Sequence, residues 1–445
     1  MLSLLMRRQT AKIQYTLYIF LTVYMWLIVI GRMAGTLLNL PVTSYYKDFN
    51  VSDWLINYQG GFVRRGLVGE SLLWLFETTQ FPPKLCVALI LVVSMTVFLV
   101  VMYEVCKRMN YSMLPVLLII SGWTSSANAY RKDFIILLLA FLVFCLLIKY
   151  LKHKQITVLV AFQLTSSLTL LIHEVAIFFI IPISFLVVWF YDNEKIFCKN
   201  KMREALSIFI IPIGTAILLF LCKGSYPVAM DIWDSWNSAF TLYPEIQGTM
   251  PMGQAVEFLS WSIDKIVDFH LQLNFRYHEG GTVILYYVLM VVLMLVMVQY
   301  IILLNPTYRK GVVSKVDNTK SLSAILLFQI ICMIPMFTVL SCDYCRTVLY
   351  VVASSIFMHY HLCKEKIILH LPWSLDCKYF SLVDSIRNQK YLSSYWFYLF
   401  VVLLFPLSDS GCIDVPGCCY VIKEYNYINI KLFATLSHYL FGYSV

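Results

Sequence analysis

Long apolar runs, broken by few charges, are the feature that most constrains the fold of this 445-residue chain. Hydrophobic residues make up 60% of the sequence and charged residues 13%, whereas soluble domains carry about a quarter charged residues. Lipid offers backbone groups no hydrogen-bond partner, and a helix satisfies them within one segment. We therefore predict an all-α, polytopic integral membrane protein.

The apolar runs predict about eleven transmembrane helices, because about 20 apolar residues cross a bilayer as a helix. The predicted spans are residues 14–36, 84–105, 112–123, 134–149, 156–172, 175–191, 205–222, 281–304, 322–341, 347–363 and 391–408. The third is too short to cross a membrane alone. We expect residues 1–445 to form a single transmembrane domain.

Lysines and arginines gather at alternate span boundaries, near the N-terminus and near residues 107–108, 149–154, 195–203, 309–320 and 364–390. Cytoplasmic loops carry such an excess, so the pattern predicts a cytoplasmic N-terminus. The formal charge of +9 then reflects orientation, and no nucleic-acid partner is needed. Residues 37–83 become a first outer loop, 223–280 a large outer loop and 409–445 an outer tail.

The stretch DWLINYQGGFVRRGLVGE, from Asp53 to Glu70, lies in the first outer loop. A Gly-Gly turn precedes Arg64 and Arg65, and an amphipathic helix is expected over Gly66–Glu77. Two guanidinium groups beside free backbone N–H groups suit a phosphate or diphosphate. The alternative is that both arginines only end a helix on the outer surface.

Two further charged pairs fall on the same predicted face. Arg131 and Asp133 begin a span, and an ion pair of Arg131 with Asp133 or Asp343 is the structural alternative to substrate binding. Asp343 and Arg346 lie at i and i+3, a spacing typical of a local ion pair. Charges at membrane depth are costly, so we expect a shared aqueous cavity or mutual pairing.

His173 and Glu174 lie between two spans with barely a turn to separate them. Neither residue is needed for a tight turn, and both would lose water there. A carboxylate or imidazole in such a place is a candidate general base.

The large outer loop has apolar residues at helical spacing, including Ile232, Trp236, Val256, Leu259, Ile263 and Ile266. Its aromatic residues, Trp233, Trp236, Tyr243, Trp261 and Phe269, suit either the lipid headgroup level or stacking on sugar rings. Cys412, Cys418 and Cys419 in the tail would allow a disulfide in an oxidising compartment.

The strings NYQGGFVRRGLVGE, RKD before a span, HE between two spans and DYCR occur in order between Asn57 and Arg346. In these motifs the chain resembles the Wzy class of bacterial repeat-unit polymerases of O-antigen and capsule synthesis. The resemblance implies a GT-C-like arrangement with amphipathic outer-face helices in the bacterial inner membrane, and a periplasmic active site. In that family a large periplasmic loop often lies between late spans, whereas here it precedes the eighth.

The resemblance also implies a reaction. A glycan on undecaprenyl diphosphate is the donor, and a sugar hydroxyl of a second lipid-linked repeat attacks it. The predicted catalytic residues are Glu174 and His173. The predicted substrate-binding residues are Arg64, Arg65, Arg131, Arg346, Asp53, Gln59 and Asp343.

Arginine suits a diphosphate because it stays charged and donates in a fork. No glycine-rich phosphate loop or metal cage is visible, so we expect no cofactor and no metal. Membrane lipid is an expected partner, and a chain-length regulator is left open. The alternatives are a GT-C glycosyltransferase that uses a polyprenyl-phosphate monosaccharide, with Asp48 or Asp53 as its acidic residue, and a transporter of the lipid-linked glycan.

Overall fold

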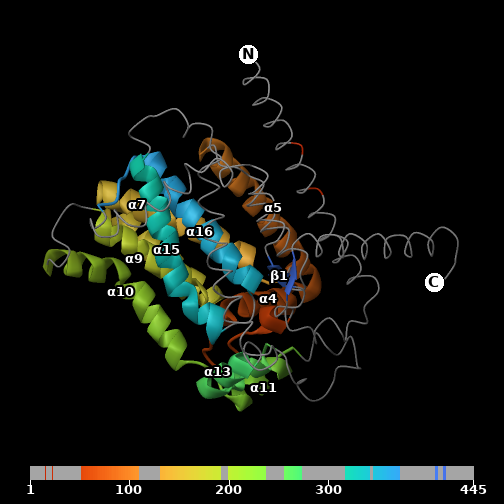
Figure 1. Cartoon of the computed structure of the whole chain (residues 1–445). Coiled ribbons are helices and arrows are strands. Elements are labelled where there is room, and N and C mark those ends of the chain that lie inside the picture. Colours follow the sequence, from red (N-terminus) through yellow and green to blue (C-terminus); the bar gives the residue numbers. More distant parts are fainter. Residues whose placement is uncertain are drawn as a thin grey trace.

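The computed structural model describes residues 52–109, 131–191, 199–236, 255–272, 316–340, 344–370, 406–408 and 414–416, with Thr16 and Val23. These residues are almost entirely helical (Figure 1). The longer helices are α4 (Gly66–Thr79), α5 (Pro83–Met109), α7 (Asp133–His153), α8 (Ile156–Ile172), α9 (Ala176–Phe190), α10 (Lys199–Leu221), α15 (Val316–Thr338) and α16 (Tyr344–Glu365). The short elements are η1 (Asp53–Leu55), α11 (Tyr226–Asp234), η4 (Glu257–Ser260), α13 (Ile263–Leu271), β1 (Pro406–Ser408) and β2 (Asp414–Pro416).

Three of these helices, α5, α7 and α10, are long and apolar enough to cross a membrane, and α8, α9 and part of α15 are shorter apolar helices. The chain is therefore a helical membrane protein. Helices α5, α7, α8, α9, α10, α15 and α16 coincide with seven of the predicted spans: 84–105, 134–149, 156–172, 175–191, 205–222, 322–341 and 347–363. The predicted spans 14–36, 112–123, 281–304 and 391–408 lie almost wholly outside the described residues.

Helix α7 lies at the centre of the bundle and packs against α5, α8, α9 and α16. Its sequence fits that place, because large apolar side chains cover most of its surface and are buried in one continuous core. Asp133 lies in its first turn and Lys152 and His153 in its last turn. The helix dipole favours acidic side chains at the N-terminus and basic ones at the C-terminus. The helix ends at His153, and its C-cap residue Lys154 adopts the left-handed conformation with φ 51°.

The two ends of the bundle differ in charge. One end carries the basic C-termini of α5, α7 and α16 and the basic N-terminus of α10. Ion pairs join these ends, between Lys152 and Glu365 at 2.7 Å and between Lys154 and Glu204. The opposite end carries the N-termini of α7 and α16 and the junction of α8 with α9.

A second apolar cluster covers this opposite end, formed by η1, α4, the start of α5, α11 and the residues around η4 (Figure 1). Its largest buried members are Trp54, Trp233 and Trp236, at 0%, 1% and 0% exposed. Trp236 Nε1 donates to the carbonyl oxygen of Leu55 at 2.9 Å. Both alternatives expected for Trp233 and Trp236, contact with lipid headgroups and stacking on sugar rings, are therefore wrong, because each ring fills a protein core instead.

Two predicted boundaries are also wrong. The helical spacing expected from Val256 to Ile266 is interrupted, because η4 ends at Ser260, Trp261 is extended and Ser262 caps α13. The last predicted span extends to residue 408, whereas residues 406–408 form β1, paired antiparallel with β2.

Candidate functional site

The loop before α4 presents the paired arginines. Its turn is closed by the Gly61 N–H, which donates to the Tyr58 carbonyl at 2.9 Å, and Gly61 has φ 115°. The carboxylate of Glu70 accepts from the Tyr58 N–H and the Gln59 side chain, each at 2.9 Å. Gln59 is exposed and bound to Glu70. It therefore supports the loop rather than joining the charged network described below.

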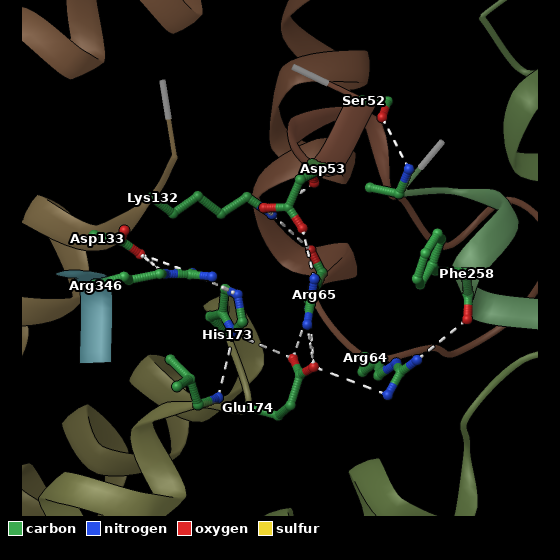
Figure 2. A network of polar contacts seen from close by, with 12 residues as sticks. Ser52, Asp53, Arg64, Arg65, Lys132, Asp133, His173, Glu174, Phe258 and Arg346 are labelled. Carbon is green, nitrogen blue, oxygen red and sulfur yellow. Dashed lines mark hydrogen bonds and ion pairs between the residues drawn. The ribbon is translucent and has the colours of Figure 1, made fainter. Parts of the chain in front are cut away.

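Arg65 occupies an unusual backbone conformation for a residue with a side chain. It is the N-cap residue of α4 and has φ 65° in the left-handed region. Such conformations cost energy and persist where the surroundings enforce them, often at functional sites. The conformation directs the Arg65 guanidinium toward Asp53 and Glu174 (Figure 2).

The Arg65 guanidinium joins two carboxylates from distant segments. Its Nε donates to both oxygens of Glu174, at 2.9 and 2.8 Å, and its Nη2 lies 2.5 Å from Oε1. Its Nη1 donates to Asp53 Oδ1 at 3.0 Å. The junction of α8 and α9 is thus tied to the first loop through one side chain.

Arg64 is bound more loosely. Its Nη1 lies 3.9 Å from Glu174 Oε1 and its Nη2 donates to the Phe258 carbonyl at 3.3 Å (Figure 2). Its Nε is buried and has no hydrogen-bond partner among the described residues. Arg64 therefore has donor capacity beside the Glu174 carboxylate that the described residues leave unused.

Behind the arginines lies a fully buried ion pair of Lys132 with Asp53. Lys132 Nζ is 3.4 Å from Asp53 Oδ2 and donates to the Asp53 carbonyl at 2.8 Å. Burial alone would raise the pKa of the Asp53 carboxyl, but Lys132 and Arg65 outweigh it and hold that pKa well below its usual range. Asp53 is therefore an anion that fixes two cations.

A second buried group joins α7 to α16. Arg346 Nη2 and Nε lie 2.7 and 2.8 Å from Asp133 Oδ1, and the Tyr350 hydroxyl also donates to this oxygen. The Asp133 side chain is 0% and the Arg346 side chain 6% exposed. Asp133 is therefore neutralised by Arg346, which reaches it from another helix, and not by the expected pair with Arg131.

His173 lies between this pair and Glu174, with its Nδ1 3.4 Å from Glu174 Oε2. Its Nδ1 faces the Val175 N–H at 3.2 Å and its Nε2 lies 2.9 Å from Arg346 Nη2, which can only donate. A neutral imidazole has one accepting nitrogen, so only one of these contacts is a hydrogen bond at a time. Burial, followed by the charges of Arg65 and Arg346, lowers the His173 pKa well below its usual value. His173 is therefore neutral at pH 7.

Glu174 is the one carboxylate of the network with substantial exposure, at 26%. Burial raises its pKa, and the charge and hydrogen bonds of Arg65 outweigh this and lower it to about 2. A carboxylate held in this way is a weak base. The general-base role of Glu174 stays a prediction, and in this arrangement it requires Arg65 to release the carboxylate.

The structure brings together Arg64, Arg65, Asp53, His173, Glu174 and Arg346 of the predicted site (Figure 2). Arg131 is half-buried next to Lys132, and Asp343 lies outside the described residues. Sequence reasoning missed Lys132 as a site residue, although it stands between Arg131 and Asp133 in the RKD string. The only signal is its position as N-cap residue of α7, which points its side chain back toward the loop.

The network can bind an anion and hold a neutral imidazole beside it. Four cations face three carboxylates, Asp53, Asp133 and Glu174, within it. Within the described ranges, no group of three or more His, Cys, Asp or Glu could hold a metal ion. No family model, no curated protein and no solved structure matches this chain.

Proposed function

We propose that this chain is a repeat-unit polymerase of O-antigen or capsule synthesis in the bacterial inner membrane. It transfers a glycan from undecaprenyl diphosphate to a sugar hydroxyl of a second lipid-linked repeat. The observation that carries the proposal is the pair of half-buried guanidinium groups, Arg64 and Arg65, converging on Glu174 at the end of the bundle opposite its lysine-rich end.

Orientation supports a periplasmic site in this proposal. Basic helix ends favour the cytoplasm, and the site lies at the other end, where Arg64 donates to the Phe258 carbonyl of η4. A lipid carrier would place its diphosphate near the membrane surface there. The resemblance in the strings around Arg64, Asp133, His173 and Arg346 points to the same donor, and each string contributes to the network.

The chemistry is a displacement at the anomeric carbon of the donor glycan. The acceptor hydroxyl oxygen forms a bond to that carbon, the bond from carbon to the diphosphate oxygen breaks, and the hydroxyl proton passes to a base. Undecaprenyl diphosphate leaves with the negative charge, which Arg64 and Arg65 stabilise by charge-assisted hydrogen bonds. Glu174, with His173 beside it, is the proposed proton acceptor.

The rival GT-C reaction would use an acidic residue of the first outer loop as its base. Asp53 suits that role poorly, because its side chain is 4% exposed and bound by Lys132 and Arg65. Asp48 lies outside the described residues. The fixed carboxylate of Asp53 favours a structural role, which supports the diphosphate-linked donor over the rival.

The test uses cells that make the polymer with this chain as their sole polymerase. Arg64→Ala and Arg65→Ala should remove the polymer ladder and leave surface material capped by a single repeat, while the protein still inserts. Lys152→Ala, at the opposite end of the bundle, is the matched control and should give a normal ladder. A normal ladder from both arginine variants would refute the proposal.

A further inference from the structure

The contact between Arg65 and Glu174 has the geometry of a guanidinium with an oxyanion ligand. Both carboxylate oxygens lie within hydrogen-bond distance of Arg65 Nε, and one also contacts Nη2. Arginine binds carboxylates and phosphates through the same pair of parallel N–H donors. A phosphate oxygen could therefore occupy the same place on Arg65 without any change in the arginine.

Arg64 lies beside this carboxylate with unfilled donors. Its Nη1 is 3.9 Å from Glu174 Oε1, beyond hydrogen-bond distance, and its buried Nε has no hydrogen-bond partner among the described residues. A carboxylate has only two oxygens, and here Arg65 engages both. A larger anion with more oxygens would satisfy both arginines together.

The charged side chains of the network differ in exposure, so that solvent reaches some of them and not others. Arg64, Arg65 and Glu174 have side chains 22%, 22% and 26% exposed. The four charged side chains behind them are 0% to 6% exposed: Asp53, Lys132, Asp133 and Arg346. Of the three carboxylates, only Glu174 is within reach of an incoming anion.

We infer that the Glu174 carboxylate occupies a phosphate-binding position, and that diphosphate binds by displacing this carboxylate from Arg65 and contacting Arg64, whose Nη1 lies 3.9 Å from it. The exchange itself is a property of the site, whereas the identity of the natural diphosphate and the role of Glu174 as a base rest on the proposed function. The buried ion pairs keep Arg65 in place while its ligand changes.

The exchange would also prepare the base. Once released, the carboxylate loses the charge and hydrogen bonds of Arg65 and stands beside phosphate charges. Both changes raise its pKa from about 2 toward the usual carboxyl range. Glu174 then accepts the proton of the acceptor hydroxyl, so that the base is active only when the donor is bound.

The experiment measures binding of inorganic pyrophosphate to the purified full-length protein in nanodiscs by titration calorimetry at pH 7. Glu174→Gln removes the competing charge and should tighten binding at least about tenfold. Glu174→Asp shortens the side chain by one methylene and should tighten binding several-fold, which also covers failure of the first variant to fold. Arg64→Ala should weaken binding about tenfold or more.

Glu70→Gln is the matched control. Glu70 is a half-buried carboxylate of α4 that accepts from Tyr58 and Gln59 of the loop, and glutamine keeps an accepting oxygen. Its pyrophosphate affinity should stay within about twofold of wild type. Equal tightening in this control would reduce the effect to net charge and overturn the inference.

Unchanged or weaker binding in both Glu174 variants, with Arg64→Ala still weakening it, would also overturn the exchange while leaving the arginine site intact. Absence of pyrophosphate binding in wild type and in both Glu174 variants would overturn it as well. The proposed function fails by a different result, a normal polymer ladder from both arginine variants. The two failures are therefore distinguishable.

Discussion

Replacing Arg346 by methionine tests whether the buried ion pairs hold the site together. The substitution keeps a long apolar side chain but leaves the Asp133 carboxylate, 0% exposed, without its cation. Removing one partner of a buried pair costs about 3–5 kcal/mol, because the remaining charge is uncompensated. We therefore expect Arg346→Met to lower the free energy of unfolding by about 4 kcal/mol.

A double-mutant cycle separates the charge from the packing. Replacing a buried pair as a whole is often nearly neutral, so Arg346→Met combined with Asp133→Asn should recover about half or more of the loss. Lys152→Met is the control, because the Lys152–Glu365 pair is 44% and 24% exposed and such pairs contribute about 0–1 kcal/mol.

The assay is reversible unfolding of the purified protein by sodium dodecyl sulfate in mixed micelles. The reasoning is refuted if Arg346→Met costs less than about 1 kcal/mol, or if the costs of the two single variants add in the double variant. Either result would mean that Asp133 finds water or another partner, and that the interior of the site is not dry.

Two further predictions concern the packing of α4 and the ion pair of Glu174. Gly69→Ala should destabilise the protein by about 1–3 kcal/mol in the same unfolding assay, because a Cβ there would overlap the Ile56 carbonyl oxygen. Gly214→Ala, in α10 with nothing within 4 Å of its added Cβ, should instead be neutral or stabilise by up to about 1 kcal/mol; equal losses in both variants would contradict this packing. The folded pKa of Glu174, about 2, lies below its ordinary value of 4.5, so its stabilising contribution is present above about pH 4.5 and is lost as pH falls toward 2. Stability should therefore fall less steeply with acid in Glu174→Gln than in wild type between these values, and parallel curves would contradict the pairing.

The helices could be predicted because their signal is local. The run from Ile156 to Ile172 gives the same bounds in sequence and structure, since a mostly apolar run without charged residues satisfies its backbone in a membrane only as a helix. The helix after Arg65 was predicted as an amphipathic helix over Gly66–Glu77 and ends two residues later than expected, at Thr79. Tryptophan was the least reliable signal, because Trp233 and Trp236 suit a headgroup layer and a protein core equally well.

The partners within the site could not be predicted, because they depend on how distant segments meet. The RKD string suggested Arg131 as the useful cation, yet Lys132 reaches Asp53 and the Asp133 carboxylate turns to Arg346. The side chains of three consecutive residues leave a helix N-terminus in different directions, and sequence alone does not say which one faces the first loop. The Arg65–Glu174 contact could likewise not be predicted from the sequence, since 109 positions separate the two residues.

The most direct test of the central claim is an experimental structure of the full-length protein with a lipid-linked diphosphate bound. We predict diphosphate density between the Arg64 and Arg65 guanidinium groups, with the Glu174 carboxylate turned away and the Asp133–Arg346 pair unchanged. Density for the diphosphate at the lysine-rich end of the bundle, or on the outer surface away from both arginines, would contradict the account.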